Sequence, residues 1–414
     1  MSKNILRIMF MKKYDVAVVG GCAAGITAAI AAKRQNPELN IVIIEKLPRI
    51  GKKILATGNG RCNLTNLNAV CNDYKNPAFV SRVFEKYSPY KVIEFFESMG
   101  LLTFSDSEGR VYPGSNMAAS VLDVLRYEAE GLGIDVICDT VVNQITKKNG
   151  VFTVNGEIEC RKVLLATGGK ASPSQGSDGS GYSLAKQLGH TVTKLYPSLV
   201  PLTASGASKA LKGVRARNVK LTLENGKVLK ETKGELLFTD NGISGIAAME
   251  LAALAEESVS TVKAKTFTHI DFLPGMTEKE LVNYLLKVKD IKGYCPMDML
   301  FVGTLPKAIG IEICKAVKLY RQDKPISFFS YRDIACIAAK AKNYVLEITG
   351  TKGFANAQVT SGGIPVSEIN AETMESKLCK GLYFAGEITD VDAGCGGYNL
   401  QWAFASGLLA GENL

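Results

Sequence analysis

The stretch VAVVGGCAAG, residues 16–25, limits most strongly what this chain can fold into. Its valine-rich start is typical of a strand buried on both faces of a sheet, and the alanine-rich residues 24–34 that follow contain no proline and are typical of a helix. A second apolar run, residues 41–44, leads to Glu45. Glu45 follows Gly25 by 20 residues, the offset expected of the carboxylate that binds the ribose of a dinucleotide. The sequence therefore favours a dinucleotide-binding βαβ unit over a ligand-free unit of the same kind.

The glycine loop departs from the usual pattern at one position. Cys22 occupies the place of the middle glycine, where the backbone comes close to the pyrophosphate, so its side chain takes up space there. Because backbone N–H groups at the helix N-terminus bind the anion, we expect a working site with weaker affinity. A catalytic thiol is disfavoured, because the position faces phosphate. The residues expected to bind this half of the cofactor are Gly20, Cys22, Ala23, Ala24, Gly25, Glu45 and Lys46.

The composition excludes some classes of partner. The chain has 414 residues, with 49 basic and 40 acidic side chains and a net charge of +9, which is mild for its length. No basic run with interleaved aromatic residues is present, so we expect no nucleic-acid partner. A moderate positive charge suits an anionic cofactor or a small anionic substrate.

Cysteine usage and the N-terminus bear on the compartment. Ten cysteines without a CxxC pair, and only two histidines, argue against a metal site and favour reduced thiols over disulfides. The apolar run ILRIMFM near the N-terminus is interrupted by Arg7, lacks a small-residue cleavage site and is too short to span a membrane. We therefore expect residues 1–12 to be a loose extension and the protein to be cytoplasmic, without stable membrane association.

The order of the segments indicates that both ends of the chain build one nucleotide-binding domain. Helical patterns cover about 78–99 and 116–132, and the run KVLLATGG, residues 162–169, is typical of a buried strand that ends in a glycine turn. From about residue 194 the pattern becomes antiparallel, with Asn225-Gly226 as a hairpin turn. A helical block follows at about 277–340. The layout is a nucleotide domain interrupted by a β and helical insertion.

The C-terminal stretch GLYFAGEITDVDAGCGGYNLQWAFASG, residues 381–407, favours a flavin over a nicotinamide alone. A predicted strand ends at Gly386-Glu387, and a glycine loop then enters a helix at Tyr398. The N-terminus of a helix offers free N–H donors and partial positive charge, which would stabilise a reduced, anionic flavin ring. Glu387 and Asp392 are suited to accept ribityl hydroxyls.

Four segments carry a resemblance to a known family. GKKILATGNGRCNLTN, VLLATGG, GELLFTDNGISG and GLYFAGE with the following DVD and GGYNLQWAF are similar to the bacterial flavoproteins that include aminoacetone oxidase and 3-dehydro-bile-acid Δ(4,6)-reductase. The resemblance covers nearly the whole chain. It implies bound FAD and an α/β fold: a three-layer, Rossmann-like FAD-binding domain with a parallel sheet, residues 1–193 plus 353–414. It also implies an antiparallel β-barrel-like insert, residues 194–274 plus 341–352, and a small helical subdomain, residues 275–340.

The resemblance also implies which residues contact FAD. Glu45 would hold the adenosine ribose, Val142 would contact adenine through its backbone, and the other residues would line the nucleotide, ribityl chain and flavin ring. These are Lys53, Thr57, Arg61, Cys62, Asn63, Ala166, Thr167, Gly168, Gly386, Glu387, Asp392, Gly397, Tyr398, Asn399 and Leu400. Besides Cys22, two positions depart from the family pattern: Asp240 stands where relatives often carry His, and Ile246 where they often carry Pro.

Arg61, Tyr398 and Asp240 are the candidate catalytic residues. Arg61 would hold an anionic substrate or flavin charge, or would only clamp its loop. Tyr398 would donate a proton near the ring, or would only pack. Asp240 would face the substrate, or would only end a strand. The sequence leaves both alternatives open for each residue.

We predict an FAD-dependent oxidoreductase that transfers a hydride between flavin and a small or steroid-like molecule, most simply the NAD(P)H-dependent reduction of an enone. No second dinucleotide fingerprint is present, so a nicotinamide would bind directly at the flavin. One alternative is an aminoacetone-type amine oxidase that produces hydrogen peroxide. The other is a flavin-binding redox sensor without catalytic activity.

Overall fold

The computed structural model describes residues 11–261 and 264–414. The loose extension expected at residues 1–12 therefore lies mostly outside the described residues, and Lys12 already belongs to the first strand. The chain divides into two compact units, residues 1–195 with 359–414, and residues 196–358. The insert was predicted to end at residue 352, but the second unit continues to Gln358. The backbone N–H of Gln358 bonds to the carbonyl of Leu199, which also belongs to this unit.

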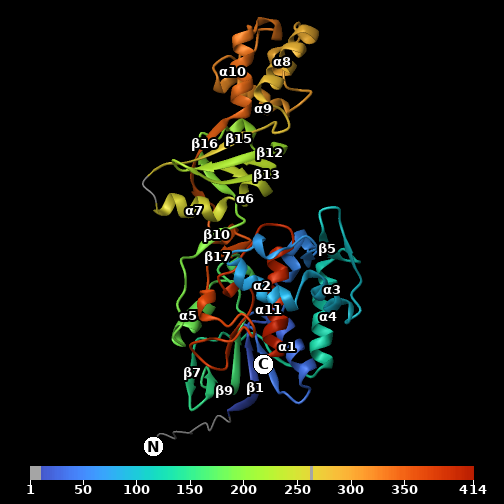
Figure 1. Ribbon diagram of the computed structural model, residues 1–414, viewed down its shortest axis with the longest axis vertical. Helices are drawn as coiled ribbons and strands as arrows, with labels where there is room; N and C mark the ends of the chain where they lie inside the picture. Colours follow the sequence, from blue (N-terminus) through green and yellow to red (C-terminus); the bar gives the residue numbers. More distant parts are fainter. Residues whose placement is uncertain (1–10, 262–263) are drawn as a thin grey trace, which may run out of the picture. The chain divides into compact units, whose positions relative to one another are not determined.

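A seven-stranded sheet forms the centre of the first unit (Figure 1). Its parallel part has the order β6, β2, β1, β9, with β18 also parallel to β9, and β8 and β7 extend it in antiparallel fashion. The strands are β1 (Lys12–Val19), β2 (Ile41–Ile44), β6 (Asp135–Ile137), β7 (Ile145–Lys148), β8 (Val151–Val154), β9 (Ile158–Leu165) and β18 (Leu382–Phe384). All four residues of β2, Ile-Val-Ile-Ile, are buried, as expected of a strand covered on both faces.

The first and last helices of this unit pack closely against each other. Helix α1 (Ala23–Gln35) and helix α11 (Tyr398–Glu412) lie side by side, blue and red in Figure 1. A Cβ atom on Gly407 would lie 2.6 Å from the carbonyl oxygen of Ala24, and one on Gly411 would lie 2.4 Å from that of Ala28. Glycine and alanine at this contact allow the backbones to approach, which joins the two ends of the chain in one domain.

The remaining elements of the first unit surround this core. They are α2 (Pro77–Lys86), α3 (Pro89–Glu97), α4 (Ala118–Gly131), α5 (Ser180–Gln187) and a small sheet of β3 (Thr65–Asn66), β5 (Arg110–Pro113) and β4 (Thr103–Ser105). The single helical pattern predicted at 78–99 was wrong. Ser88 is extended and Pro89 begins a new helix, because a proline restricts the preceding residue and is favoured in the first helical turn.

The second unit contains a closed six-stranded antiparallel barrel. Its strand order is β11 (Leu202–Ser205), β14 (Gly242–Ser244), β13 (Val228–Thr239), β12 (Arg215–Glu224), β15 (Thr266–Asp271) and β16 (Tyr344–Thr351). The predicted Asn225-Gly226 turn joins β12 to β13, with Gly226 at φ +71°. A Rossmann-like domain with a parallel sheet and a barrel insert is thereby confirmed.

Helices complete the second unit. They are α6 (Ile246–Met249), α7 (Ala252–Thr261), α8 (Glu278–Lys292), α9 (Lys307–Ala316) and α10 (Tyr331–Lys342). The last three fall in the predicted helical block, whereas α6 and α7 were not predicted. All ten cysteines belong to the described residues, and none of them forms a disulfide. Within residues 11–261 and 264–414, no helix is both long and apolar enough to cross a bilayer, and no three His, Cys, Asp or Glu side chains cluster as metal ligands would.

Candidate cofactor site

The glycine loop between β1 and α1 is shaped by two glycines that no other residue could replace without movement. Gly20 has φ +105°, and a Cβ there would lie 2.5 Å from the carbonyl oxygen of Ala166. A Cβ on Gly25 would lie 2.0 Å from the carbonyl oxygen of Gly20. No side chain caps the N-terminus of α1. Its first N–H groups therefore have no partner within the helix and, with the partial positive charge there, suit a pyrophosphate.

Cys22 fits this loop without backbone strain. It is the N-cap of α1, with φ −122° and ψ −159°, an extended conformation that any residue adopts. Burial raises the pKa of the Cys22 thiol, and it raises that of Cys62 to about 12. Both groups therefore stay protonated at neutral pH, which disfavours thiolate chemistry at the site.

We expect Cys22→Gly to leave the stability of the protein nearly unchanged, because glycine is an acceptable N-cap residue. FAD affinity should stay the same or increase, since removing the side chain restores the close backbone approach to pyrophosphate. Equilibrium dialysis of FAD against the apoprotein of both forms would measure this. A large loss of affinity in the glycine variant would mean that the sulfur itself contributes to binding.

Glu45 connects three segments of the site. It directly follows β2 and is buried. Its carboxylate accepts the backbone N–H of Gly21 at 2.8 Å and of Leu47 at 2.9 Å, and its carbonyl accepts the N–H of Thr140 at 3.0 Å. Each carboxylate oxygen has a second lone-pair direction. Glu45 can therefore fix the glycine loop and accept a ribose hydroxyl at the same time.

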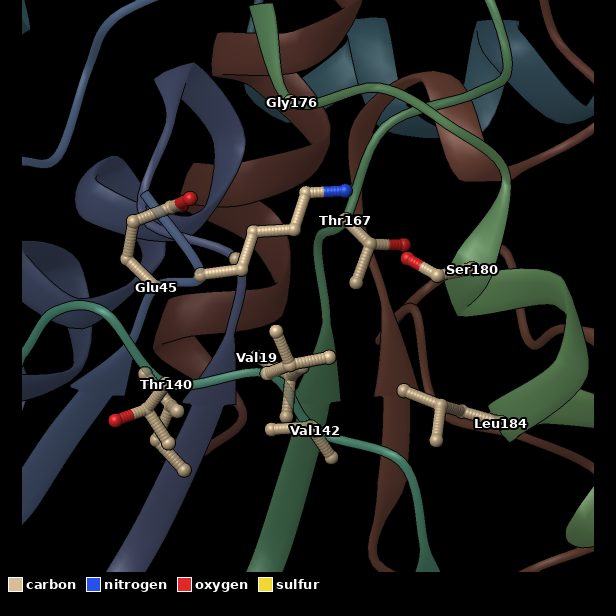
Figure 2. A pocket seen from close by; sticks show the side chains of 12 residues that line it. Val19, Glu45, Thr140, Val142, Thr167, Gly176, Ser180 and Leu184 are labelled. Atoms are coloured by element: carbon tan, nitrogen blue, oxygen red, sulfur yellow. The ribbon is translucent and has the colours of Figure 1, made fainter. Parts of the chain in front are cut away.

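A pocket lies at the carboxyl ends of β1, β2 and β9, the edge where parallel α/β sheets bind ligands. Figure 2 shows Glu45, Thr140, Val142, Thr167 and Ser180 around this one hollow. Its lining residues are Val19, Gly20, Ile44, Glu45, Lys46, Thr140, Val141, Val142, Thr167, Gly176, Ser180 and Leu184. Thr140, Gly176 and Ser180 were not predicted as cofactor residues. Thr140 lies in the loop after β6, Gly176 lies in the glycine-rich segment before α5, and Ser180 begins α5.

Lys53 and Glu387 meet although they lie 334 positions apart in the sequence. The Lys53 ammonium is 2.9 Å from the Glu387 carboxylate, and it also contacts Ser177 Oγ at 3.3 Å. The other carboxylate oxygen of Glu387 accepts the backbone N–H of Thr360 at 2.8 Å. Thr360 Oγ1 in turn accepts the N–H of Lys170 at 2.7 Å. The ion pair thus lies among four segments of the chain. Its two members were both predicted to contact the cofactor, whereas Thr360 was not predicted.

The loop before α11 is held in shape by side chains on both sides. Gly397, the N-cap of α11, has φ +99°, and a Cβ there would lie 2.6 Å from the carbonyl oxygen of Thr65. The Asn399 amide accepts the N–H of Ala393 at 3.0 Å and donates to the carbonyl of Ala393 at 2.9 Å. Asn66 donates to the carbonyl of Gly396 at 2.9 Å. The predicted cofactor residue Asn399 therefore shapes the loop that presents the N-terminus of α11.

Asp392 is a buried carboxyl beside this loop. It accepts a hydrogen bond from Ser361 Oγ at 2.9 Å. Burial raises its pKa to about 6, and the neighbouring carboxylates of Asp390 and Glu387 act in the same direction. Asp390 is paired with Lys75 at 2.6 Å. Asp392 is therefore largely protonated below pH 6, so it can donate as well as accept a hydrogen bond there.

Two of the three candidate catalytic residues lie in the first unit and one lies in the second. The Arg61 guanidinium is exposed and lies over the ring of Tyr112, 4.5 Å from its centroid. Tyr398 is the first residue of α11, and its carbonyl accepts a hydrogen bond from the Tyr74 hydroxyl at 2.9 Å. Asp240 belongs to the second unit, in the exposed turn after β13, and pairs with Lys212 at 2.6 Å.

The remaining predicted cofactor residues lie in the same first unit. Thr57 Oγ1 donates to the carbonyl of Ile54 at 2.6 Å, and Cys62 adopts φ +57°. Asn63 Oδ1 is buried and has no hydrogen-bond partner among the described residues. Ala23, Ala24, Ala166, Gly168, Gly386 and Leu400 lie in the loops or helix turns that follow β1, β9 and β18 and begin α11.

These features fit FAD. The uncapped N-terminus of α1 suits its pyrophosphate, the pocket with Glu45 suits its adenosine, and the N-terminus of α11 suits the polar edge of a flavin ring. At positions 20, 25 and 397 a Cβ would collide with backbone atoms. Only glycine therefore allows these loops to keep their present conformation.

Comparison with known proteins agrees with this geometry. A family model described as the HI0933-like protein Rossmann domain matches residues 14–413. The 3-dehydro-bile acid delta(4,6)-reductase of Clostridium scindens is 38% identical over 403 residues, which cover 96% of this chain and 98% of that protein. The ribosomal RNA dihydrouridine synthase of Escherichia coli K12 is 28% identical over 413 residues, 98% of each chain.

Among solved structures, a 3-ketosteroid-delta4-(5alpha)-dehydrogenase from Rhodococcus jostii is 14% identical and matches with a TM-score of 0.48, over all of this chain and 98% of that one. The family model spans nearly every residue, and the relative from Clostridium scindens spans nearly the whole length of both proteins. The chain belongs to the HI0933-like family of FAD-dependent oxidoreductases with a Rossmann-like domain.

Proposed function

We propose that this protein is an FAD-dependent reductase that adds two hydrogens across a carbon–carbon double bond conjugated to a carbonyl group, with NAD(P)H as the electron donor. The observation that carries the proposal is the 38% identity, over 96% of the chain, with an enzyme named 3-dehydro-bile acid delta(4,6)-reductase. The product named for the Escherichia coli relative, dihydrouridine, is also a hydrogenated form of its parent compound.

Two segments of the first unit would hold FAD, one near the start of the sequence and one near its end. The N–H groups at the start of α1 would bind the pyrophosphate, and Glu45 would accept the adenosine ribose hydroxyls. The N-terminus of α11 would face the polar edge of the ring, where its partial positive charge favours the reduced form. When bound, FAD supplies hydride transfer. Val142 would contact the adenine from the pocket wall.

Other residues would prepare the substrate for the reaction. Reduction of the double bond of an enone requires a hydrogen-bond donor at the carbonyl oxygen, a hydride for the β-carbon and a proton for the α-carbon. Tyr398, at the start of α11, is the proposed proton donor, and Arg61, held over Tyr112, is the proposed group for an anionic part of the substrate. A nicotinamide would bind directly against the flavin, because only one dinucleotide fingerprint is present in the sequence.

Glu45→Gln should weaken FAD binding by about tenfold or more. The amide has one acceptor oxygen in place of two, so it cannot hold both N–H groups of the loop and a ribose hydroxyl, and a hydrogen bond to a charged group contributes about 1.5–3 kcal/mol. Titration of the apoprotein with FAD would measure the change. Glu38→Gln, on the surface after α1, is the matched control. Unchanged affinity in the Glu45 variant would show that the acid does not serve the cofactor.

Asp240→Ala tests whether the second unit contributes to the substrate site. If it does, the KM for an enone should rise several-fold while FAD affinity stays the same. Lys212→Ala removes the partner of the same ion pair and is the control for effects of the pair alone. Equal kinetics in the parent and the Asp240 variant would mean that this carboxylate only ends β13.

The reaction itself can be tested by mass spectrometry. The purified protein, with NADH or NADPH under argon, should add two mass units to a 4-en-3-one steroid, and omission of the nicotinamide should abolish the product. Formation of hydrogen peroxide from aminoacetone without nicotinamide would support the amine oxidase instead. Absence of turnover with both substrates would support the redox sensor.

A second candidate substrate is uridine in RNA. It is favoured by the uneven distribution of charge: residues 196–358 contain 23 basic and 16 acidic side chains, so this unit carries seven of the nine net positive charges. The relative from Escherichia coli is named as a ribosomal RNA dihydrouridine synthase. Incubation with deproteinised ribosomal RNA and NAD(P)H, followed by nucleoside analysis, separates the two substrates. If dihydrouridine were formed in the RNA, uridine in RNA would replace the enone as the proposed substrate.

A further inference from the structure

The second unit contains a groove of about 470 Å³. None of its lining residues was predicted to contact FAD. This volume lies in the range of sites for small organic molecules, about 300–1,000 Å³. The groove is lined by the start of β12, the loop after β15 and the segment before α9. Its lining residues are Arg215, Ala216, Arg217, Asn218, Phe272, Leu273, Pro274, Gly275, Met276, Thr304, Leu305 and Pro306.

One side of the groove is apolar. Phe272 and Leu305 are buried, and Leu273, Pro274 and Met276 are half-buried. The loop that carries the last three is fixed in place, because the Lys342 ammonium donates to the carbonyls of Leu273 and Met276 and pairs with Asp271. This wall is therefore preformed.

The part of β12 that lines the groove contains a β-bulge with an arginine. The pairing of β12 with β13 shifts between Ala216 and Val219, so that Arg217 and Asn218 together face one residue of the partner strand. Asn218 adopts φ +55°. Bulges of this kind redirect side chains and are common at the rims of barrels and beside binding sites.

Two charged residues, Arg215 and Arg217, line the groove, and they differ in their partners. Arg215 pairs with Glu235 at 3.0 Å, Lys307 with Asp298 at 2.5 Å, and Lys342 with Asp271 at 2.7 Å. Arg217 has no carboxylate within 4.0 Å among residues 11–261 and 264–414. The groove thus combines an apolar wall with a guanidinium that has no carboxylate partner among the described residues.

We propose that this groove is a second ligand site, which binds a small apolar molecule with one carboxylate or sulfonate group. The apolar body lies on Phe272, Leu273, Met276 and Leu305, and the anionic group pairs with Arg217, whose planar guanidinium suits a carboxylate. The groove shares no lining residue with the pocket at Glu45. The net positive charge of the second unit favours the approach of an anion.

Two fluorescent probes test the site in the flavin-loaded protein: anilinonaphthalene sulfonate, and phenylnaphthylamine, which has the same rings without the charge. The parent should bind one equivalent of the anionic probe, and dodecanoate should displace it. Arg217→Gln should weaken the anionic probe at least tenfold and the neutral probe less than twofold. Arg332→Gln, an exposed arginine on α10, should change neither.

A second variant separates the groove from general surface binding. Gly275 has no atom within 4 Å of where its Cβ would lie, so Gly275→Trp adds a large side chain to the lining of the groove without backbone strain. It should abolish binding of both probes while the protein keeps its flavin absorbance. Undiminished binding in either the Arg217 or the Gly275 variant overturns the proposal. Displacement of the probe by an RNA oligonucleotide, with no displacement by dodecanoate, also overturns it and indicates a nucleic-acid surface.

Discussion

Gly25→Ala is expected to destabilise the first unit by several kcal/mol and to abolish measurable FAD binding. An added Cβ would lie 2.0 Å from the carbonyl oxygen of Gly20, a backbone atom that can move only if the whole loop moves. Overpacking of this kind costs about 1–3 kcal/mol and sometimes more. The displaced loop would also lose the Gly21 N–H bond to Glu45. Urea denaturation and FAD titration would measure the two effects.

Gly131→Ala is the matched control, because Gly131 also lies in a helix, at the end of α4, and its Cβ would meet no atom within 4 Å. Helix propensity alone predicts that this variant is as stable as the parent or up to about 1 kcal/mol more stable. If Gly25→Ala behaved like Gly131→Ala and kept FAD, the close approach of α1 to the loop would not be required for cofactor binding.

Asp392→Asn is expected to stabilise the protein at alkaline pH. The folded pKa of about 6 lies above the ordinary value of 3.8, so the folded protein binds the proton more tightly than the unfolded chain does. The stability contributed by this proton is fully present below pH 3.8 and is lost as the pH rises through 6. At 1.36 kcal/mol for each pKa unit, the charged carboxylate costs up to about 3 kcal/mol above that pH.

The asparagine variant removes this cost and can keep the hydrogen bond from Ser361. It should therefore be more stable than the parent at pH 8 and about equal to it at pH 4, when the free energy of unfolding of the apoprotein is measured in urea. Asp123→Asn, at an exposed position of α4, should follow the parent at both values. If the Asp392→Asn variant were less stable than the parent at pH 8, other interactions in the folded state would offset the cost of burying the charged carboxylate.

Much of the fold follows from local patterns. The valine run of β1, the alanine-rich α1 and the acid after β2 predict the dinucleotide-binding unit, because each part has a distinct period and composition. The Asn225-Gly226 turn likewise marks the hairpin of the barrel. The break at Ser88-Pro89 was missed because apolar periodicity continues across it, and α7 was missed because its short alanine-rich sequence lies inside a β-rich segment.

The site was only partly predictable, because its geometry depends on pairs far apart in sequence. Motifs identify Lys53 and Glu387 separately, but no pattern shows that they form an ion pair or that Thr360 binds the second oxygen of the acid. The burial that raises the pKa of Asp392 is a tertiary property as well. From the sequence, the side chain of Cys22 was expected to take up space beside the pyrophosphate. Its extended backbone conformation shows that the loop accepts a cysteine there without backbone strain.

An anaerobic redox cycle tests the central claim most directly. The purified protein is yellow by this account, and heat should release FAD and not FMN. Under argon, addition of NADH or NADPH should bleach the flavin absorbance, and subsequent addition of a 4-en-3-one steroid should restore it with loss of the double bond. Absence of flavin after reconstitution with FAD, or bleaching by aminoacetone and not by either nicotinamide, would contradict the account.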